Sequence, residues 1–412
     1  MASWLLSLLS TEVDTSLTCL QHPGVVDAHI RHGSRESSSA QEETAWTFAV
    51  VSAEPKTVGT LVHSRGCFAL LLRLIQRPSE EVRLQATWAL ANLSLQPKAT
   101  AHLLSLCAVS HLVGTLRTAQ SEALIHQAMR CLGTLLTDAQ ARAQLLEMCG
   151  EAGDASWALA FFARHASSPA EALQGTALRA LVHSLAQPFS LSHTFLELPG
   201  AEGIERLCGL LTDQESLSDR RAGIVCSAVL QLALATTSRD ASTARDEATF
   251  PTPLTQCIEP VLSMAANDEL TPGARVHAVA AIRQLACCNA GDADHTLAEH
   301  IVLQGALPIL ESLANSREAE HAGLRAGCAA AMEVLTRCLT PSSRRTYATW
   351  SRAHAWRPED GSSVPRRIRR CSPLGVDALR VELPRNMPQS LEDRSKPELR
   401  CMVQTMSELA TN

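Results

Sequence analysis

The side chains best suited to chemistry in this sequence are 15 histidines and 14 cysteines, and neither set has the spacing of a catalytic or metal site. His295 and His300 are five residues apart around Glu299, whereas a helical H-E-x-x-H pattern would place two histidines on one face. Cys287 and Cys288 are adjacent, so they point to different faces of a helix, and no C-x-x-C occurs anywhere. We therefore predict no metal ligands and no cofactor, and we interpret the cysteines as reduced, mostly buried apolar side chains.

The signature motifs of the main enzyme classes are also missing. The sequence has no G-x-x-x-x-G-K-[ST] phosphate loop, no G-x-G-x-x-G after a strand, no H-E-x-x-H and no G-x-S-x-G. The net charge of -6 and the pI of about 6.2 argue against a protein that coats nucleic acid. We therefore predict a protein that is not an enzyme and whose partners are not nucleic acids.

Signals for secretion or membrane insertion are weak. No apolar run approaches the ~20 residues that a membrane span needs, and no Lys or Arg precedes Arg31, although a signal peptide begins with a basic segment. Fourteen cysteines without a disulfide-like spacing pattern are typical of a reducing compartment. We therefore expect no membrane span and a location in the cytoplasm or the nucleus.

The positions of the apolar residues predict the secondary structure. Hydrophobic residues make up 46% of the chain but aromatic residues only 3%, so Leu, Ala and Val carry the apolar content and favour helix over strand. In the segment 81–94, Ala86, Ala89, Leu90 and Leu93 follow a small-x-x-small-apolar-x-x-apolar pattern, which forms one stripe of a helix. The sequence therefore predicts an all-α protein.

This pattern is repeated along the chain, which is the strongest signal in the sequence. Copies in the same register lie 42 residues earlier and 42 residues later, and each is preceded by a second apolar segment with turn residues between the two. Looser copies follow at spacings of 48 to 53 residues. The central small residues of the seven copies are Thr47, Ala89, Cys131, Ala180, Ala228, Ala281 and Ala331.

The repeat resembles the armadillo family. The segment 82–94, VRLQATWALANLS, is similar to the third helix of armadillo repeats of the importin-α and β-catenin kind, and Gly66 and Gly305 match the glycine that precedes the family's second helix. The resemblance covers residues 45–340 and implies a right-handed α-solenoid of about six to seven armadillo-type repeats. HEAT repeats are the alternative with a similar period. Residues 1–44 are expected to form a degenerate N-terminal cap and a polar loop.

The resemblance also implies a ligand site, because armadillo proteins bind peptides in a concave groove lined by their third helices. It gives Asn92 the role of holding an extended peptide backbone and gives Trp88 the role of contacting basic side chains through its ring face. Trp46 would line the same groove, whereas Arg130 and Arg179 replace Trp in later repeats and would favour an acidic ligand. It is equally open whether Trp88 is a packing residue and whether Asn92 is hydrogen-bonded locally.

The C-terminal region 341–412 differs from the rest of the chain. It contains seven prolines and is predicted to be a largely disordered Pro/Arg-rich tail. It holds 13 Arg and Lys against 8 Asp and Glu, a net +5, so residues 1–340 carry -11. Its basic run could be a solvated segment, a nuclear-localisation signal, or an intramolecular or nucleic-acid contact. The arginines of the run are Arg366, Arg367, Arg369 and Arg370.

The functional prediction is a non-catalytic scaffold or adaptor that binds extended or helical segments of protein partners in the groove. A second hypothesis is an importin-α-like nuclear-transport adaptor, which a single Trp88/Asn92 pair and the lack of a basic N-terminus disfavour. The chain could also be a structural component of a ciliary or cytoskeletal assembly, or a solenoid that regulates an attached catalytic module. The sequence leaves the oligomeric state open.

Overall fold

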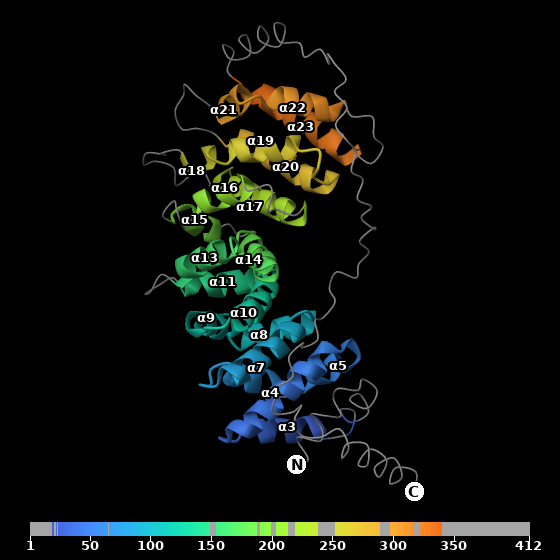
Figure 1. The fold of residues 1–412 in the computed structure, drawn as a ribbon, viewed down its shortest axis with the longest axis vertical. Helices are drawn as coiled ribbons and strands as arrows, with labels where there is room; N and C mark the ends of the chain where they lie inside the picture. The colour runs from blue at the N-terminus through green and yellow to red at the C-terminus, as the bar shows by residue number, and fades with distance from the viewer. Residues whose placement is uncertain are drawn as a thin grey trace.

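The protein is an elongated stack of α-helices in its computed structural model (Figure 1). The structure describes residues 19, 22, 24–64, 66–148, 154–187, 190–198, 203–212, 219–237, 252–288, 297–315 and 322–339, and these ranges contain helices and turns but no strand. In Figure 1 the chain climbs from α3 at the bottom to α23 at the top, layer upon layer. The predicted all-α solenoid is therefore confirmed.

One set of helices runs through the whole stack, each packing on the one before and the one after. All seven repeat residues identified from the sequence lie on these helices and are buried, which confirms the repeat assignment and gives seven repeats within the described residues. We call this set of helices the third helices. They are α4 (Ser38–Ala53), α7 (Glu80–Leu93), α10 (Glu122–Leu135), α14 (Glu171–Ser184), α17 (Asp219–Thr237), α20 (Pro272–Cys287) and α23 (Ala322–Cys338).

The remaining helices complete the repeats and pack against the third helices. In the middle of the stack they lie to the left in Figure 1 and the third helices lie to the right. The second helices are α3 (Val25–Gly33), α6 (Cys67–Leu74), α9 (Ala108–Thr118), α13 (Asp154–His165), α16 (Ile204–Thr212), α19 (Ile258–Ala266) and α22 (Ala306–Ala314). The first helices are α5 (Pro55–His63), α8 (Pro97–Ser105), α11 (Ala139–Glu147), α15 (Ser190–Leu196), α18 (Thr252–Thr255) and α21 (Leu297–Leu303).

Helix starts recur with the same period as the apolar stripe. Ser37, Ser79 and Ser121 are the N-cap residues of three consecutive third helices, and each side-chain oxygen accepts a hydrogen bond from the backbone N–H three residues on. Gly66 and Gly305 precede second helices with φ of +87° and +86°, a left-handed conformation that glycine adopts at little cost. The predicted glycine-then-helix feature is thus confirmed at both positions, and local backbone chemistry sets where these helices begin.

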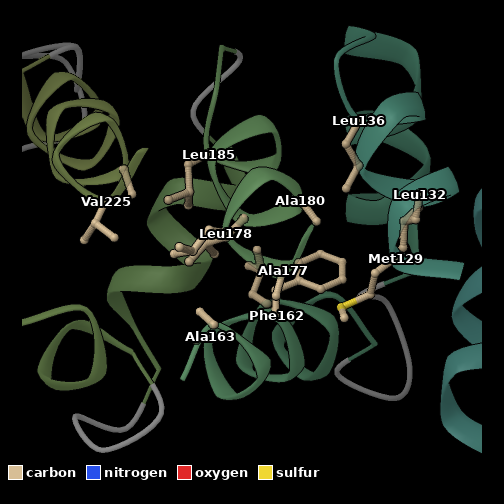
Figure 2. Close-up of a cluster of buried hydrophobic side chains, with 14 of the residues drawn as sticks. Met129, Leu132, Leu136, Phe162, Ala163, Ala177, Leu178, Ala180, Leu185 and Val225 are labelled. Atoms are coloured by element: carbon tan, nitrogen blue, oxygen red, sulfur yellow. The ribbon is translucent and has the colours of Figure 1, made fainter. Parts of the chain in front are cut away.

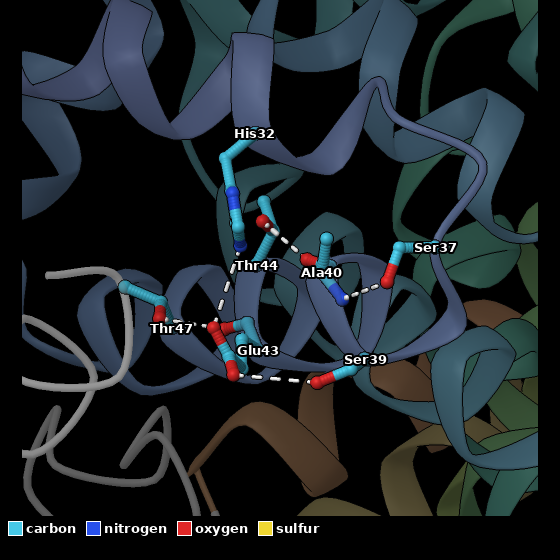
Figure 3. A network of polar contacts seen from close by, with 7 residues as sticks. All are labelled: His32, Ser37, Ser39, Ala40, Glu43, Thr44 and Thr47. Atoms are coloured by element: carbon cyan, nitrogen blue, oxygen red, sulfur yellow. Dashed lines mark hydrogen bonds and ion pairs between the residues drawn. The ribbon is translucent and has the colours of Figure 1, made fainter. Parts of the chain in front are cut away.

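The first repeat begins earlier than expected. We predicted a cap and a polar loop over residues 1–44 and repeats from residue 45, but α3 and α4 already pack together as a repeat. The Ser37 N-cap starts α4, and a 3.4 Å contact between His32 Nε2 and Glu43 Oε2 ties the two helices (Figure 3). The serine-rich polar stretch is a helix start here, because Ser is favoured at N-caps as well as in loops.

No single described helix is long and apolar enough to cross a membrane. Among the described helices, one pair taken together is long and apolar enough for a membrane span. This pair is α8 and α9, which meet at an 82° bend.

A single hydrophobic core extends along the described stack, and small residues decide how closely its helices approach. Figure 2 shows Met129 and Leu132 of α10 beside Phe162 of α13 and Ala180 of α14. Gly133 faces Ala180 so closely that an added Cβ would lie 3.2 Å from the Ala180 Cα. The α10–α14 contact therefore depends on a missing side chain.

Gly133→Ala is expected to destabilise the protein by about 1–3 kcal/mol, because the added methyl meets backbone that must move. The matched control is Gly114→Ala in α9, where an added Cβ meets nothing within 4 Å. That variant should be neutral or more stable by about 0.5–1 kcal/mol, because alanine favours helix over glycine. Urea unfolding of the three proteins checks this, and equal effects at the two sites would contradict it.

Candidate functional site

The residues predicted to line the groove lie on four consecutive third helices. Trp46 is on α4, Trp88 and Asn92 are on α7, Arg130 is on α10 and Arg179 is on α14. Trp88, Arg130 and Arg179 are half-buried, so each keeps a face toward solvent. Trp46 is 5% exposed and Asn92 is 2% exposed, which differs from the expectation that both are open to a ligand.

Asn92 is held by neighbouring third helices. Its Nδ2 donates to Ser52 Oγ on α4 at 3.2 Å, and its Oδ1 accepts from Arg130 Nη2 on α10 at 2.6 Å. The amide thus links α4, α7 and α10 in one chain of hydrogen bonds. The role expected for Asn92, a free amide that holds a peptide backbone, does not fit this geometry, because an arginine in the next repeat reaches back to its acceptor.

Polar contacts of the same kind continue up the stack. His183 Nδ1 on α14 lies 2.7 Å from the carbonyl oxygen of Gly133 on α10, so that nitrogen carries the proton and donates. Ser227 Oγ on α17 lies 3.1 Å from His277 Nδ1 on α20, and Gln284 Nε2 on α20 donates to Thr237 on α17 at 2.9 Å. These linking residues were not predicted. The sequence offered one signal for these links, which is that polar residues recur at the positions predicted to line the groove.

A cluster of positive charge surrounds the middle of α14. Burial lowers the pKa of Arg179, and the nearby charge of Arg220 lowers it further. No carboxylate of the described residues pairs with Arg179, whose Nη2 donates to Thr176 Oγ1 at 3.1 Å. Burial also lowers the pKa of His183, opposed by its bond to Gly133, and Arg179 and Arg142 add to the lowering. An anion placed here would offset this repulsion.

The two tryptophans present hydrogen-bond donors that the described part of the chain does not use. The Nε1 atoms of Trp46 and Trp88 are shielded from solvent and have no acceptor among the described residues. A buried indole N–H usually finds a partner, because leaving it unpaired costs about 1–3 kcal/mol. The two residues occupy the same register of neighbouring repeats, 42 positions apart. The helices α4, α7, α10 and α14 therefore carry two unsatisfied indole donors, both shielded from solvent, together with a cationic cluster.

The described residues do not group into a metal site. Across the part of the chain that the structure describes, no three His, Cys, Asp or Glu side chains come together in a way that could hold an ion. Cys288 turns back toward α17, where its thiol contacts Thr236 and Ala233. The basic run at Arg366, Arg367, Arg369 and Arg370 lies outside the described residues.

Comparison with known proteins agrees with the fold. Residues 65–95, which span α6 and α7, match the family model of the Armadillo/beta-catenin-like repeat. A chain from a structure of the interaction between cadherin and β-catenin superposes with a TM-score of 0.67 at 18% identity, covering 85% of this chain and 60% of that one. The chain has the fold of an armadillo-repeat solenoid. An engineered protein also superposes, with a TM-score of 0.65 at 19% identity over 81% of this chain and 74% of that one. No curated protein matches the sequence.

The armadillo fold clarifies how this chain departs from the importin-α-like pattern on which the ligand site was predicted. That pattern pairs a Trp with an Asn on the third helix in repeat after repeat, and here Trp88 and Asn92 form the one complete pair. The Asn of that pair carries hydrogen bonds between repeats. For Trp88, Arg130 and Arg179, a ligand-facing role stays a prediction.

Asn92→Ala is expected to lower the free energy of unfolding by about 1–3 kcal/mol, because Ser52 and Arg130 lose a buried partner. Gln231→Ala is the matched control, since Gln231 is half-buried at the equivalent register on α17 and lies outside this chain of inter-repeat hydrogen bonds. Its effect should stay within about 0.5 kcal/mol. Chemical denaturation decides, and an Asn92 variant as stable as the parent would mean that the inter-repeat bonds contribute nothing.

Acidification is expected to weaken the α10–α14 contact through His183. The pKa of His183 is lowered in the folded protein, so the unfolded chain binds the proton more readily. The free energy of unfolding therefore falls as the pH drops below about 6.5. His183→Gln keeps a donor for Gly133 but cannot be protonated, so its unfolding free energy should fall less between pH 7 and 5. Equal slopes for the parent and the variant would rule out this role.

Proposed function

We propose that this armadillo solenoid is a non-catalytic scaffold or adaptor that binds a segment of a partner protein across α4, α7, α10 and α14. The single observation that carries the proposal is the alignment, on consecutive third helices, of the half-buried Trp88, whose indole N–H has no acceptor in the described chain, with the half-buried Arg130 and Arg179. A ligand carbonyl or carboxylate would satisfy this indole group.

The chemistry of this surface supports an extended ligand with acidic side chains. Trp88 is half-buried, so its indole N–H is suited to donate to a backbone carbonyl and its ring face offers apolar contact area. Arg179 lies next to a second arginine and lacks a carboxylate partner in the described chain, so an acidic side chain would relieve the repulsion. Arginine also binds carboxylates in a two-pronged geometry, which gives such a contact direction as well as strength.

The structural comparison is consistent with a protein ligand. The similar chain comes from a structure of the interaction between cadherin and β-catenin, in which this fold belongs to a protein that engages another protein. The positive cluster at α14 disfavours an importin-α-like adaptor, because a basic ligand segment would be repelled there. We assign the protein to the cytoplasm or the nucleus, since all of its described cysteines are free thiols.

A peptide-display selection against the intact protein tests the function. Enriched peptides are expected to contain Asp and Glu, and Trp88→Ala and Arg179→Gln should each weaken their binding at least about 10-fold, as loss of a charged or aromatic contact does. Trp157→Ala is the matched control, because Trp157 is a half-buried tryptophan on the second helix α13. It should leave affinity unchanged.

Fluorescence anisotropy with one enriched peptide measures these affinities, and circular dichroism verifies that each variant stays folded. Peptides rich in Lys and Arg would contradict the assigned ligand chemistry. Peptides that lose affinity with Trp157→Ala but not with Trp88→Ala would place the site on the second helices instead.

A further inference from the structure

Two cysteines from successive repeats meet side by side in the upper half of the stack. Cys208 lies on α16 and Cys257 immediately precedes α19, two second helices that pack together. Their sulfur atoms are 3.1 Å apart although the residues are separated by 49 positions in sequence, and both are free thiols. A disulfide bond is about 2.05 Å long, so the two sulfur atoms need to approach by about 1 Å to form one.

The two thiols differ in environment in a way that assigns them different chemical roles. Cys208 is 9% exposed and Cys257 is fully buried, so an oxidant from solvent reaches Cys208 first. The hydrogen bond from Cys257 lowers the pKa of Cys208, with burial and Glu205 opposing it. The same bond, together with burial, raises the pKa of Cys257. Cys208 is thus the better thiolate, and Cys257 holds its proton until a later step.

We propose that Cys208 and Cys257 are a redox modification site that forms a reversible disulfide on reaction with a hydroperoxide. The Cys208 thiolate attacks the peroxide oxygen, the O–O bond breaks, and Cys208 becomes a sulfenic acid while the leaving oxygen takes up a proton. The Cys257 sulfur then attacks the Cys208 sulfur and displaces hydroxide, which leaves as water with the Cys257 proton. Two thiols are oxidised to one disulfide, and one hydroperoxide is reduced.

The bond would link the second helices of the fifth and sixth repeats directly. Without it, these two repeats are joined by packing and by the chain that passes through α17 and α18. A crosslink over 49 positions restricts the unfolded chain, so the oxidised protein should melt at a higher temperature than the reduced one. This inference is independent of the proposed ligand surface, which lies on third helices of earlier repeats.

The test treats the intact reduced protein with hydrogen peroxide in the presence of a metal chelator, followed by alkylation and peptide mapping by mass spectrometry. The expected product is a crosslinked pair of peptides containing Cys208 and Cys257, lost on treatment with dithiothreitol. Cys257→Ser should abolish the crosslink and leave Cys208 as a sulfenic acid that dimedone traps. Cys208→Ser should leave Cys257 reduced.

Cys288→Ser is the control, because Cys288 is also a buried thiol of this half of the stack and takes no part in the reaction. It should give the parent's yield of crosslink. A crosslink between Cys257 and the buried Cys226, or oxidation of Cys208 to sulfinic acid with no crosslink, would overturn the proposal. Circular dichroism of Cys257→Ser and of a second variant, Cys257→Ala, verifies that both are folded, so that a missing crosslink is not the result of unfolding.

Discussion

The whole architecture depends on one constraint: each repeat can bury its apolar face only against the repeats beside it. The third helices satisfy it by approaching closely, which small residues at one register make possible. Ala89, Ala180 and Ala281 are fully buried there, and Gly133 removes even a methyl group where α10 meets α14. Because the core is continuous along the described stack, a local change in the distance between two third helices also changes the packing of the neighbouring repeats on both sides.

Close packing also determines what the polar residues of the third helices can do. Once α4, α7 and α10 are in contact, Asn92 lies within reach of Ser52 and Arg130 and is used to hold the helices together. The buried amide therefore contributes to the stability of the scaffold, whereas Trp88 and Arg179 on neighbouring third helices are the residues that we propose bind a ligand.

The same geometry creates contacts on the other side of the stack. Because successive second helices also lie side by side, α16 and the start of α19 bring two thiols together that no local sequence pattern connects. Chemistry in such a fold therefore arises between repeats, at residues that each repeat alone would leave as ordinary core or edge positions.

The sequence by itself determined the helical class, the seven repeat positions and much of where helices start. These are local effects: apolar stripes and glycine turns involve residues within about four positions of one another, so they are visible in the chain. The serine caps are local as well, but serine is favoured in loops too, so the chain alone did not identify the helix start at Ser37. Only the tertiary structure decided the partner of Asn92, the burial of Trp46, the earlier start of the first repeat and the pairing of Cys208 with Cys257. The physical reason is that contacts between repeats depend on the rotation and distance of one layer relative to the next, which are set by the summed packing of many side chains.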